Sequence, residues 1–312
     1  MPQEPEVSVV IASYNSKRTV EACLKSLEEQ ITPRDYEVIL VDSSTDGTGE
    51  LVERKYPRVM VHRCSERKFA GDARNLGISK ARGKLIAFLD ADCQAESDWI
   101  EKIAEAHESP YPAIGGAIAN GTPDSYVGCA AYFCEFSGWM PGLISQLMDD
   151  IAGANMSYKK DIFDKYGYFI EGTYCSDTEF HWRLGKNGLR LRFDPSVRIS
   201  HYNIDRLGKF LNHEMFHGRC FAEVRIRAQR FSRLRRLIYV AFSPLLPVRL
   251  FYNITLNSIE NGTYFRRFLW SSPLVLLGVI CWSLGEALGY ARGLGENDGA
   301  GKPSNYHRPE IC

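Results

Sequence analysis

The residues with the clearest chemical potential are Asp90 and Asp92, which directly follow an apolar run at 85–89. Five consecutive apolar residues predict a strand that is buried on both faces, as in a parallel sheet. The Asp-x-Asp pair then lies at the carboxyl end of this strand, where open α/β sheets bind their ligands. Two hard oxygen donors suit Mg²⁺ or Mn²⁺, which proteins hold with one or two carboxylates and the phosphates of a substrate. By itself, however, such a pair is more typical of a surface turn or a helix cap.

Strand and helix patterns alternate through the first 90 residues. The predicted strands cover residues 7–12, 37–41, 59–62 and 85–89, and the predicted helices between them cover 19–30, 49–55 and 70–81. Short connections between alternating strands and helices predict a doubly wound, mostly parallel α/β sheet. Because polar residues follow each strand, we expect Asn15, Asp42 and Asp90 or Asp92 to converge on one edge of the sheet.

The next hundred residues continue this pattern less regularly. The expected elements are helices at 98–109, near 160–166 and at 176–187, and strands at 113–118, 189–193 and 197–201. Residues 126–148 are less regular and rich in aromatic side chains.

The composition indicates a folded protein in a reducing compartment. The chain has 312 residues, 45% hydrophobic and 24% charged, with a net charge of zero. Its nine cysteines include no C-x-x-C pair and no zinc-site spacing, so neither a disulfide framework nor a zinc site is expected. The polar and acidic N-terminus is unlike a signal peptide, which favours a cytoplasmic location for the N-terminal domain.

A basic segment precedes the most apolar part of the chain. Basic residues outnumber acidic ones between 205 and 237, and residues 268–285 carry no charge. We expect a membrane surface rather than a nucleic acid as the partner, because a nucleic-acid binder has a compact basic domain with interleaved aromatic residues. A spanning helix at about 268–290, a buried core helix and an interfacial hairpin all remain open, although Arg266 and Arg267 fit a cytoplasmic flank.

Six segments in the same order resemble the family 2 inverting glycosyltransferases of the GT-A fold. The segments are VSVVIASYN (7–15), VDSSTDGT (41–48), GDARNLGISKARGKLIAFLDAD (71–92), GANMSYKK (153–160), SDTEFHWRLGKNGLRLRFDP (176–195) and a final His201. The resemblance implies a nucleotide-sugar glycosyltransferase domain at 6–203. The remaining residues, 204–312, would form a basic and apolar helical tail that associates with a membrane, as in bacterial members of this type.

The resemblance also implies a donor site at the edge of the sheet. Tyr14 would stack on the base, Asp42 would accept a hydrogen bond from the base or ribose, and Arg74 would pair with the base or a phosphate. Ser43 stands where the family often has a second aspartate, so the base preference stays open. The donor-binding residues implied are Ser13, Tyr14, Asn15, Asp42, Arg74, Asn75, Asp90 and Asn155.

The same resemblance assigns the metal ligands and the base. Asp92 would bind the metal, Asp90 the ribose or a metal-bound water, and His201 would complete the shell, favouring Mn²⁺ over Mg²⁺. Asp177 would be the catalytic base of a single displacement, and Glu179 is the alternative base. Ser176 stands where the family usually has a glutamate.

Together with the basic and apolar tail, the resemblance implies transfer of one sugar from a nucleotide-diphosphate donor to a lipid-linked or membrane-proximal acceptor on the cytoplasmic face of the membrane, as in cell-envelope polysaccharide synthesis. A UDP-linked donor is the expectation among the bases left open. A processive synthase is disfavoured because the chain has no Gln-x-x-Arg-Trp motif. A nucleotidyltransferase is disfavoured because the first loop is not glycine-rich. An inactive GT-A domain that serves as a membrane scaffold remains the alternative from another class.

Overall fold

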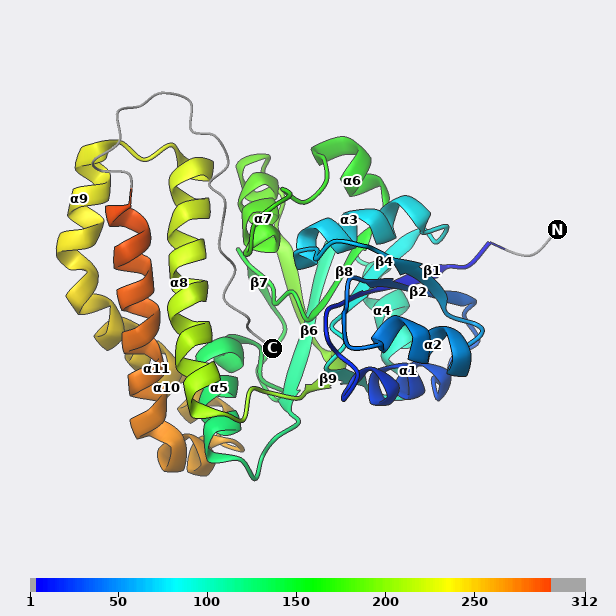
Figure 1. Cartoon of the computed structure of the whole chain (residues 1–312), viewed down its shortest axis with the longest axis horizontal. Helices are drawn as coiled ribbons and strands as arrows, with labels where there is room; N and C mark the ends of the chain where they lie inside the picture. The colour runs from blue at the N-terminus through cyan, green and yellow to red at the C-terminus, as the bar shows by residue number, and fades with distance from the viewer. Residues whose placement is uncertain (1–3, 293–312) are drawn as a thin grey trace. The chain divides into compact units, whose positions relative to one another are not determined.

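Residues 4–292 are described by a computed structural model (Figure 1), in which the chain forms two units. The sheet unit contains the residues up to 122 together with 138–203. The helical unit contains 123–137 together with the residues from 204 onward. The expected division after residue 203 therefore coincides with one of these boundaries, but the segment 123–137 groups with the C-terminal helices.

The sheet unit is built on one mixed sheet of nine strands in the order β3-β2-β1-β4-β8-β6-β9-β5, with β7 beside β9. The strands are β1 Val7–Ser13, β2 Tyr36–Asp42, β3 Met60–Arg63, β4 Leu85–Leu89, β5 Cys93–Ala95, β6 Ala113–Asn120, β7 Gln146–Met148, β8 Asn155–Lys159 and β9 Leu191–His201. Strands β1 to β4 are mutually parallel, β8 is antiparallel to both β4 and β6, and β9 is parallel to β6. Strands β1, β2, β4, β6 and β9 therefore all end at one edge, which we call the carboxyl edge.

Helices lie against the faces of this sheet and bury its apolar strands (Figure 1). They are α1 Val20–Glu28, α2 Thr48–Lys55, α3 Ala70–Lys80, α4 Trp99–His107, α6 Asp161–Tyr166 and α7 Ser176–Lys186. In β4 every residue is buried, as its uninterrupted apolar sequence predicts. Phe88 in this strand makes edge-to-face contacts with Tyr158, Phe163 and Phe169, which join β4 to β8 and α6.

The predicted α/β fold with a mostly parallel sheet is confirmed, with local differences. The predicted strands at 189–193 and 197–201 belong to one continuous strand, β9, which pairs with β6 across a register shift between Gly116 and Ala117. The less regular segment 126–148 contains a helix, α5 Tyr126–Phe136, the short turn η1 Ser137–Trp139 and the strand β7, and the strands β5 and β8 are additional to those expected. Helix α5 is buried on most of its faces, and burial all round removes the apolar-polar period on which sequence-based detection depends.

The helical unit combines α5 with the helices that follow residue 204. These are α8 Leu207–Gln229, α9 Arg233–Phe242, the turn η2 Ser243–Leu245, α10 Leu246–Asn261 and α11 Phe265–Ala291. Helices α8 and α11 pack at backbone distance, because a Cβ at Gly218 would lie 2.2 Å from the carbonyl oxygen of Trp282 and one at Gly285 would lie 2.0 Å from that of Met215. Only glycine permits this approach at both positions.

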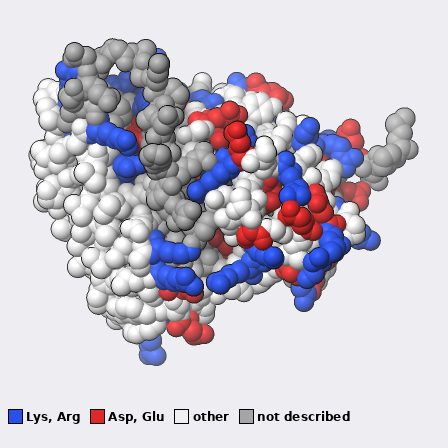
Figure 2. Space-filling view, viewed as in Figure 1, with Lys and Arg blue, Asp and Glu red and all other residues white. Residues whose placement is uncertain are grey.

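Two segments of the helical unit are long and apolar enough to cross a membrane, judged by length and composition. They are Arg233–Asn261 and Phe265–Ala291, and the 18-residue apolar windows within them are 6% and 44% buried inside the structure. Exposed apolar side chains gather on them, including Phe242, Leu245 and Val248. In Figure 2 the surface over α9, α10 and α11 is mostly uncharged.

We predict that His107 makes the stability of the sheet unit sensitive to mild acid. Burial and the nearby Lys159 lower the pKa of His107 to about 3, and its Nε2 lies 2.9 Å from Ser157 Oγ. In the unfolded chain the pKa is about 6.5, so the unfolded state gains a proton first and the free energy of unfolding falls as the pH drops below that value. Denaturant titrations at pH 7 and pH 5 should show a smaller loss of stability in His107→Gln than in the unchanged protein. An equal loss in both proteins would contradict the prediction.

Candidate active site

The carboxyl edge brings together the residues predicted to bind a donor. Ser13 at the end of β1 is paired in register with Asp42 at the end of β2, and β1 also pairs with β4, which precedes Asp90. Asp42 is 3% exposed, and its Oδ1 accepts a hydrogen bond of 2.5 Å from Ser44 Oγ. The predicted convergence of Asn15, Asp42 and Asp90 is therefore present in the structure.

The loop after β1 is tied to the loop after β2. Asn15 adopts a left-handed conformation with φ of 53°, its amide N–H donates to Ser44 Oγ at 2.7 Å, and its Oδ1 accepts from the amide of Thr45 at 2.9 Å. The guanidinium of Arg67 lies 4.1 Å from the centre of the Tyr14 ring. A cation over one face of this ring is a contact that the sequence did not reveal.

Asp92 and His201 lie close together and carry side chains that could hold a cation. His201 ends β9 and pairs in register with Cys93 of β5, so its Nε2 lies 3.5 Å from Asp92 Oδ1. Asn203 Oδ1 lies 3.0 Å from His201 Nδ1, an arrangement that places the second ring nitrogen toward the carboxylate. The Asp92, Cys93 and His201 ligand atoms all lie within 4.8 Å of one another. Cys93 is fully buried, and burial together with Asp92 and Asp90 raises the pKa of its thiol.

Arg74 joins the metal motif to the predicted base. Its side chain, on α3, is 5% exposed; one terminal nitrogen donates to Asp90 Oδ1 and to the carbonyl oxygen of Gly153, each at 2.9 Å. The other terminal nitrogen lies 3.7 Å from Asp177 Oδ2. Burial lowers the pKa of Arg74, but the two carboxylates raise it more, so the guanidinium remains charged. Burial raises the pKa of Asp90, an effect that Arg74 partly offsets.

Asp177 is in the first turn of α7, where the helix dipole favours an ionised carboxylate. The preceding residue outside the helix, Cys175, has a left-handed backbone with φ of 57°, which turns the chain sharply into α7. Asp177 is 21% exposed, so its carboxylate contacts Arg74 and remains accessible to solvent. A carboxylate that is held by Arg74 and open to solvent is a candidate base.

Three other predicted site residues have different surroundings. Glu179 is bound to Arg183 at 2.8 Å, one turn along α7, and is not among the described partners of Arg74. Asn75 exchanges two hydrogen bonds with the backbone of Phe169 and so holds the loop before α7. Asn155 is 1% exposed, because its amide group bonds to β6, β9 and the indole of Trp99. The expectation that Asn155 contacts the donor is therefore corrected: its side chain connects strands.

A chain of hydrogen-bonded polar groups beside α7, in which His181 and Tyr158 are buried and Asp150 is partly exposed, was missed. Asp150 Oδ1 is hydrogen-bonded to His181 Nδ1, its Oδ2 accepts from Thr178 Oγ1 at 3.1 Å, and His181 Nε2 lies 2.5 Å from Tyr158 Oη. Thr178 and His181 both belong to the helix that carries Asp177. No sequence spacing connects Asp150 with His181, because their contact depends on the packing of α7 against β8.

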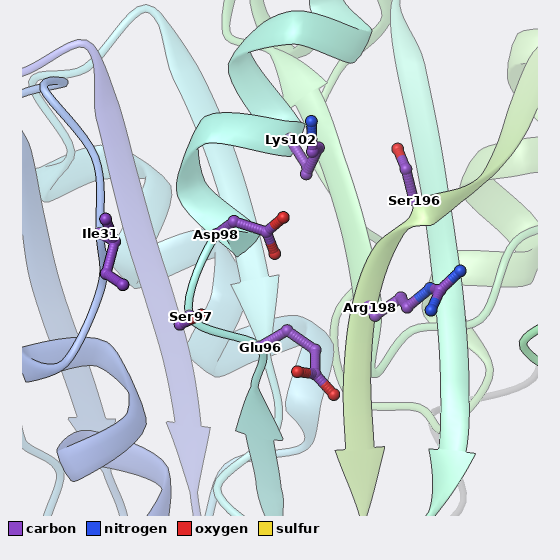
Figure 3. Close-up of a pocket in the computed structure, with 7 residues that line it drawn as sticks. All are labelled: Ile31, Glu96, Ser97, Asp98, Lys102, Ser196 and Arg198. Atoms are coloured by element: carbon purple, nitrogen blue, oxygen red, sulfur yellow. The ribbon is translucent and has the colours of Figure 1, made fainter.

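A cavity is also present elsewhere in the sheet unit. Figure 3 shows this hollow of about 540 Å³, which Glu96, Ser97, Asp98 and Arg198 line with Ile31, Lys102 and Ser196. Glu96 follows β5 at the end away from Asp92. The hollow is therefore separate from the predicted metal and donor residues.

The chain belongs to the glycosyl transferase family 2, whose sequence profile matches residues 8–167. It is 28% identical to Glycosyltransferase AglE of Haloferax volcanii over 255 residues, which cover 78% of this chain and 83% of that one. It is 40% identical to an Escherichia coli enzyme, UDP-Glc:alpha-D-GlcNAc-diphosphoundecaprenol beta-1,3-glucosyltransferase WfaP, over 88 residues, which cover 28% and 35% of the two chains.

Solved structures share the fold. The mannosyltransferase PcManGT of Pyrobaculum calidifontis, determined with GDP-Man and Mn²⁺, aligns over 93% of this chain and 88% of its own with a TM-score of 0.65 and 18% identity. TarS 1–349 of S. aureus with UDP-GlcNAc aligns over 92% of each chain with a TM-score of 0.53 and 17% identity. The predicted GT-A fold and membership of a glycosyltransferase family are confirmed.

We predict that Gly153→Ala disables the site without unfolding the protein. An alanine Cβ would lie 2.2 Å from Asp177 Oδ2 and 3.2 Å from the Arg74 guanidinium, so the carboxylate must move. Turnover of the nucleotide-sugar donor should fall by about tenfold or more, because small displacements of a reacting group are costly. The matched control is Gly185→Ala in α7, where a new Cβ meets nothing within 4 Å and should leave turnover unchanged. Equal turnover in the two variants would contradict the prediction.

Proposed function

We propose that this protein is an inverting, metal-dependent glycosyltransferase that moves one sugar from a nucleotide-diphosphate donor to an acceptor hydroxyl. The observation that carries the proposal is the position of Arg74, which contacts Asp90 of the metal motif and Asp177 at the start of α7. A donor held by the metal motif would have its sugar near this carboxylate.

The donor would lie along the carboxyl edge. Tyr14 would stack on the base while Asp42 and Ser13 contact the nucleoside, and Asp92 with His201 would hold Mn²⁺ or Mg²⁺. When bound, the cation supplies positive charge to the departing diphosphate. The mixed oxygen and nitrogen ligand set favours Mn²⁺, which is also the ion in the solved complex of PcManGT.

Asp177 would act as the base. Its carboxylate would accept the proton of the acceptor hydroxyl as the oxygen bonds to the anomeric carbon and the bond to the diphosphate breaks. A single displacement of this kind inverts the anomeric configuration. Arg74 would orient the Asp177 carboxylate, since its buried and charged guanidinium lies 3.7 Å from it. Glu179 is a weaker candidate because its carboxylate is bound to Arg183.

The donor class and acceptor class are inferred from relatives. UDP-linked sugars occur in the names of WfaP and the TarS complex, whereas PcManGT was determined with GDP-Man, so we favour a UDP-linked donor with GDP as the alternative. WfaP acts on a diphosphoundecaprenol acceptor and another H. volcanii relative is named Glucosyl-dolichyl phosphate glucuronosyltransferase. A lipid-linked or membrane-proximal glycan acceptor, as in cell-envelope polysaccharide synthesis, is consistent with these names.

We propose further that the helical unit binds the cytoplasmic surface of a membrane. The apolar surface over α9 and α10 is largely unburied, and Arg233, Arg235 and Arg236 lie at the start of α9. An apolar face beside basic side chains suits a membrane that contains anionic lipids. An inactive GT-A scaffold remains the second candidate, favoured only by this same surface.

We predict that Asp177→Asn lowers transfer by about 10²- to 10⁴-fold while donor binding persists. Asp92→Asn should instead abolish the increase in melting temperature that UDP gives in the presence of Mn²⁺. Transfer rates and thermal melting of the purified full chain, with and without Mn²⁺, measure both effects. The control is Glu179→Gln, which should retain most of the transfer activity. Unchanged transfer in Asp177→Asn would contradict Asp177 as the base. Absence of both transfer and any nucleotide effect in the unchanged protein would favour the scaffold.

We predict that the double change Val248→Asp and Leu256→Asp weakens binding to vesicles of phosphatidylcholine and phosphatidylglycerol. Both side chains are on α10 and are 68% and 45% exposed. Charged residues at these positions would remove apolar contact with the lipid without disturbing the packing inside the helical unit. Flotation with vesicles should show the unchanged protein at the top of the gradient and the variant at the bottom. Ile31→Asp, at an apolar side chain of the sheet unit that is 74% exposed, is the control and should float.

A further inference from the structure

The helical unit contains a cavity of about 390 Å³ that is lined by α8, α9, η2, α10 and α11. This volume is within the range of small-molecule sites, which is about 300–1,000 Å³. Its lining combines apolar side chains with a small number of charged ones, the usual composition of a site that orients an amphiphilic ligand. All of these residues belong to the helical unit.

The charged side of the cavity has two arginines and one carboxylate. Glu286 is 5% exposed, and its oxygens accept from Tyr290 Oη at 2.7 Å and from Trp282 Nε1 at 3.3 Å. Arg225 lies 3.7 Å from Glu286 and offsets its charge. Arg249 is exposed and makes no hydrogen bond or ion pair with another residue in the range 4–292. The cavity therefore has a net positive charge, carried by Arg249.

Arg225 is fixed in place but retains an unused donor. Its terminal nitrogen donates to Tyr290 Oη at 3.3 Å, and its guanidinium lies 5.0 Å from the centre of the Tyr239 ring. Within the described part of the chain, its Nε is buried and has no hydrogen-bond partner. Because Arg225 also lines the cavity, an anion there would meet its charged guanidinium.

The apolar side of the cavity is open to the surroundings. Ile238, Phe242 and Leu245 line it and are 45%, 63% and 63% exposed. A small free anion would use the arginines but leave these side chains in water. An anion with a hydrocarbon chain would use both sides, because the chain would cover the apolar side chains.

We propose that this cavity binds the phosphate headgroup of a membrane lipid, with Arg249 and Arg225 on the phosphate and the hydrocarbon chain along Ile238, Phe242 and Leu245. This inference rests on the proposed membrane association of the helical unit. The arginines would recognise a phosphate group in either a lipid or free phosphate. Only a lipid has a hydrocarbon chain that would contact the apolar side chains.

The test is native mass spectrometry of the full chain in detergent with three probes: short-chain phosphatidic acid, short-chain phosphatidylcholine and inorganic phosphate. We expect one bound phosphatidic acid per chain, with phosphatidylcholine and inorganic phosphate binding at least about tenfold more weakly. Arg249→Gln should weaken phosphatidic acid binding by about tenfold or more, the effect expected from losing a hydrogen bond to a charged group. Phe242→Gln should weaken the binding of phosphatidic acid but leave the binding of inorganic phosphate unchanged.

The matched control is Arg266→Gln, which removes an exposed arginine of α11 that does not line the cavity. Equal losses in Arg249→Gln and Arg266→Gln would show a general charge effect and overturn the proposal, as would inorganic phosphate binding as tightly as the lipid. Vesicle flotation of the unchanged protein separates the proposal of membrane binding from the proposal of a phosphate-binding cavity. If it does not float, the membrane proposal fails; if it floats but the cavity variants bind phosphatidic acid normally, only the cavity proposal fails.

Discussion

The buried guanidinium of Arg74 is the interaction on which the candidate site depends. It connects helix α3 with Asp90 after β4, with the carbonyl of Gly153 before β8 and with Asp177 at the start of α7. Asp90 and Asp177 both carry negative charge near one another, and without a cation between them their repulsion would separate the two sides of the site. Breaking a buried pair of this kind costs about 3–5 kcal/mol, although the partial exposure of Asp90 and Asp177 reduces that figure. Residue 153 must be a glycine for Asp177 to stay beside Arg74, because any larger residue would displace the Asp177 carboxylate.

Helix α7 is held on its other side by a separate polar chain. Asp150 contacts Thr178 and His181, and His181 contacts Tyr158 of β8, so the first turns of α7 are fixed to the sheet.

The helical unit has a different basis of stability: α8 and α11 pack closely through glycines, while the outer faces of α9 and α10 remain exposed. The sheet unit thus has the rigidity that a catalytic site requires, and the helical unit exposes apolar surface that a lipid phase could cover.

The sequence predicted the features that depend on local pattern. The buried strand before Asp90, the helix that carries Asp177 and the position of His201 at the end of a strand all follow from apolar periodicity and from the family motifs. Sequence reasoning failed where the answer depends on tertiary packing. Helix α5 is buried on most faces and so shows no amphipathic period, the amide of Asn155 is used between strands, and Asp150 meets His181 only because α7 packs against β8. Arg74 was expected to pair with the base or a phosphate of the donor, whereas its partners within the protein, two carboxylates and a carbonyl, depend on tertiary packing.

The most direct test of this account is a double-mutant cycle on kcat for Arg74→Gln and Asp177→Asn, measured at saturating donor and Mn²⁺. Under these conditions differences in donor and metal affinity do not contribute, so the cycle reports how the two residues act on the chemical step. If Arg74 acts by holding Asp177 as the base, the double variant should be no slower than the slower single variant. Effects that multiply, so that the double variant is slower by the product of the two single losses, would show that the residues act independently and would contradict the account.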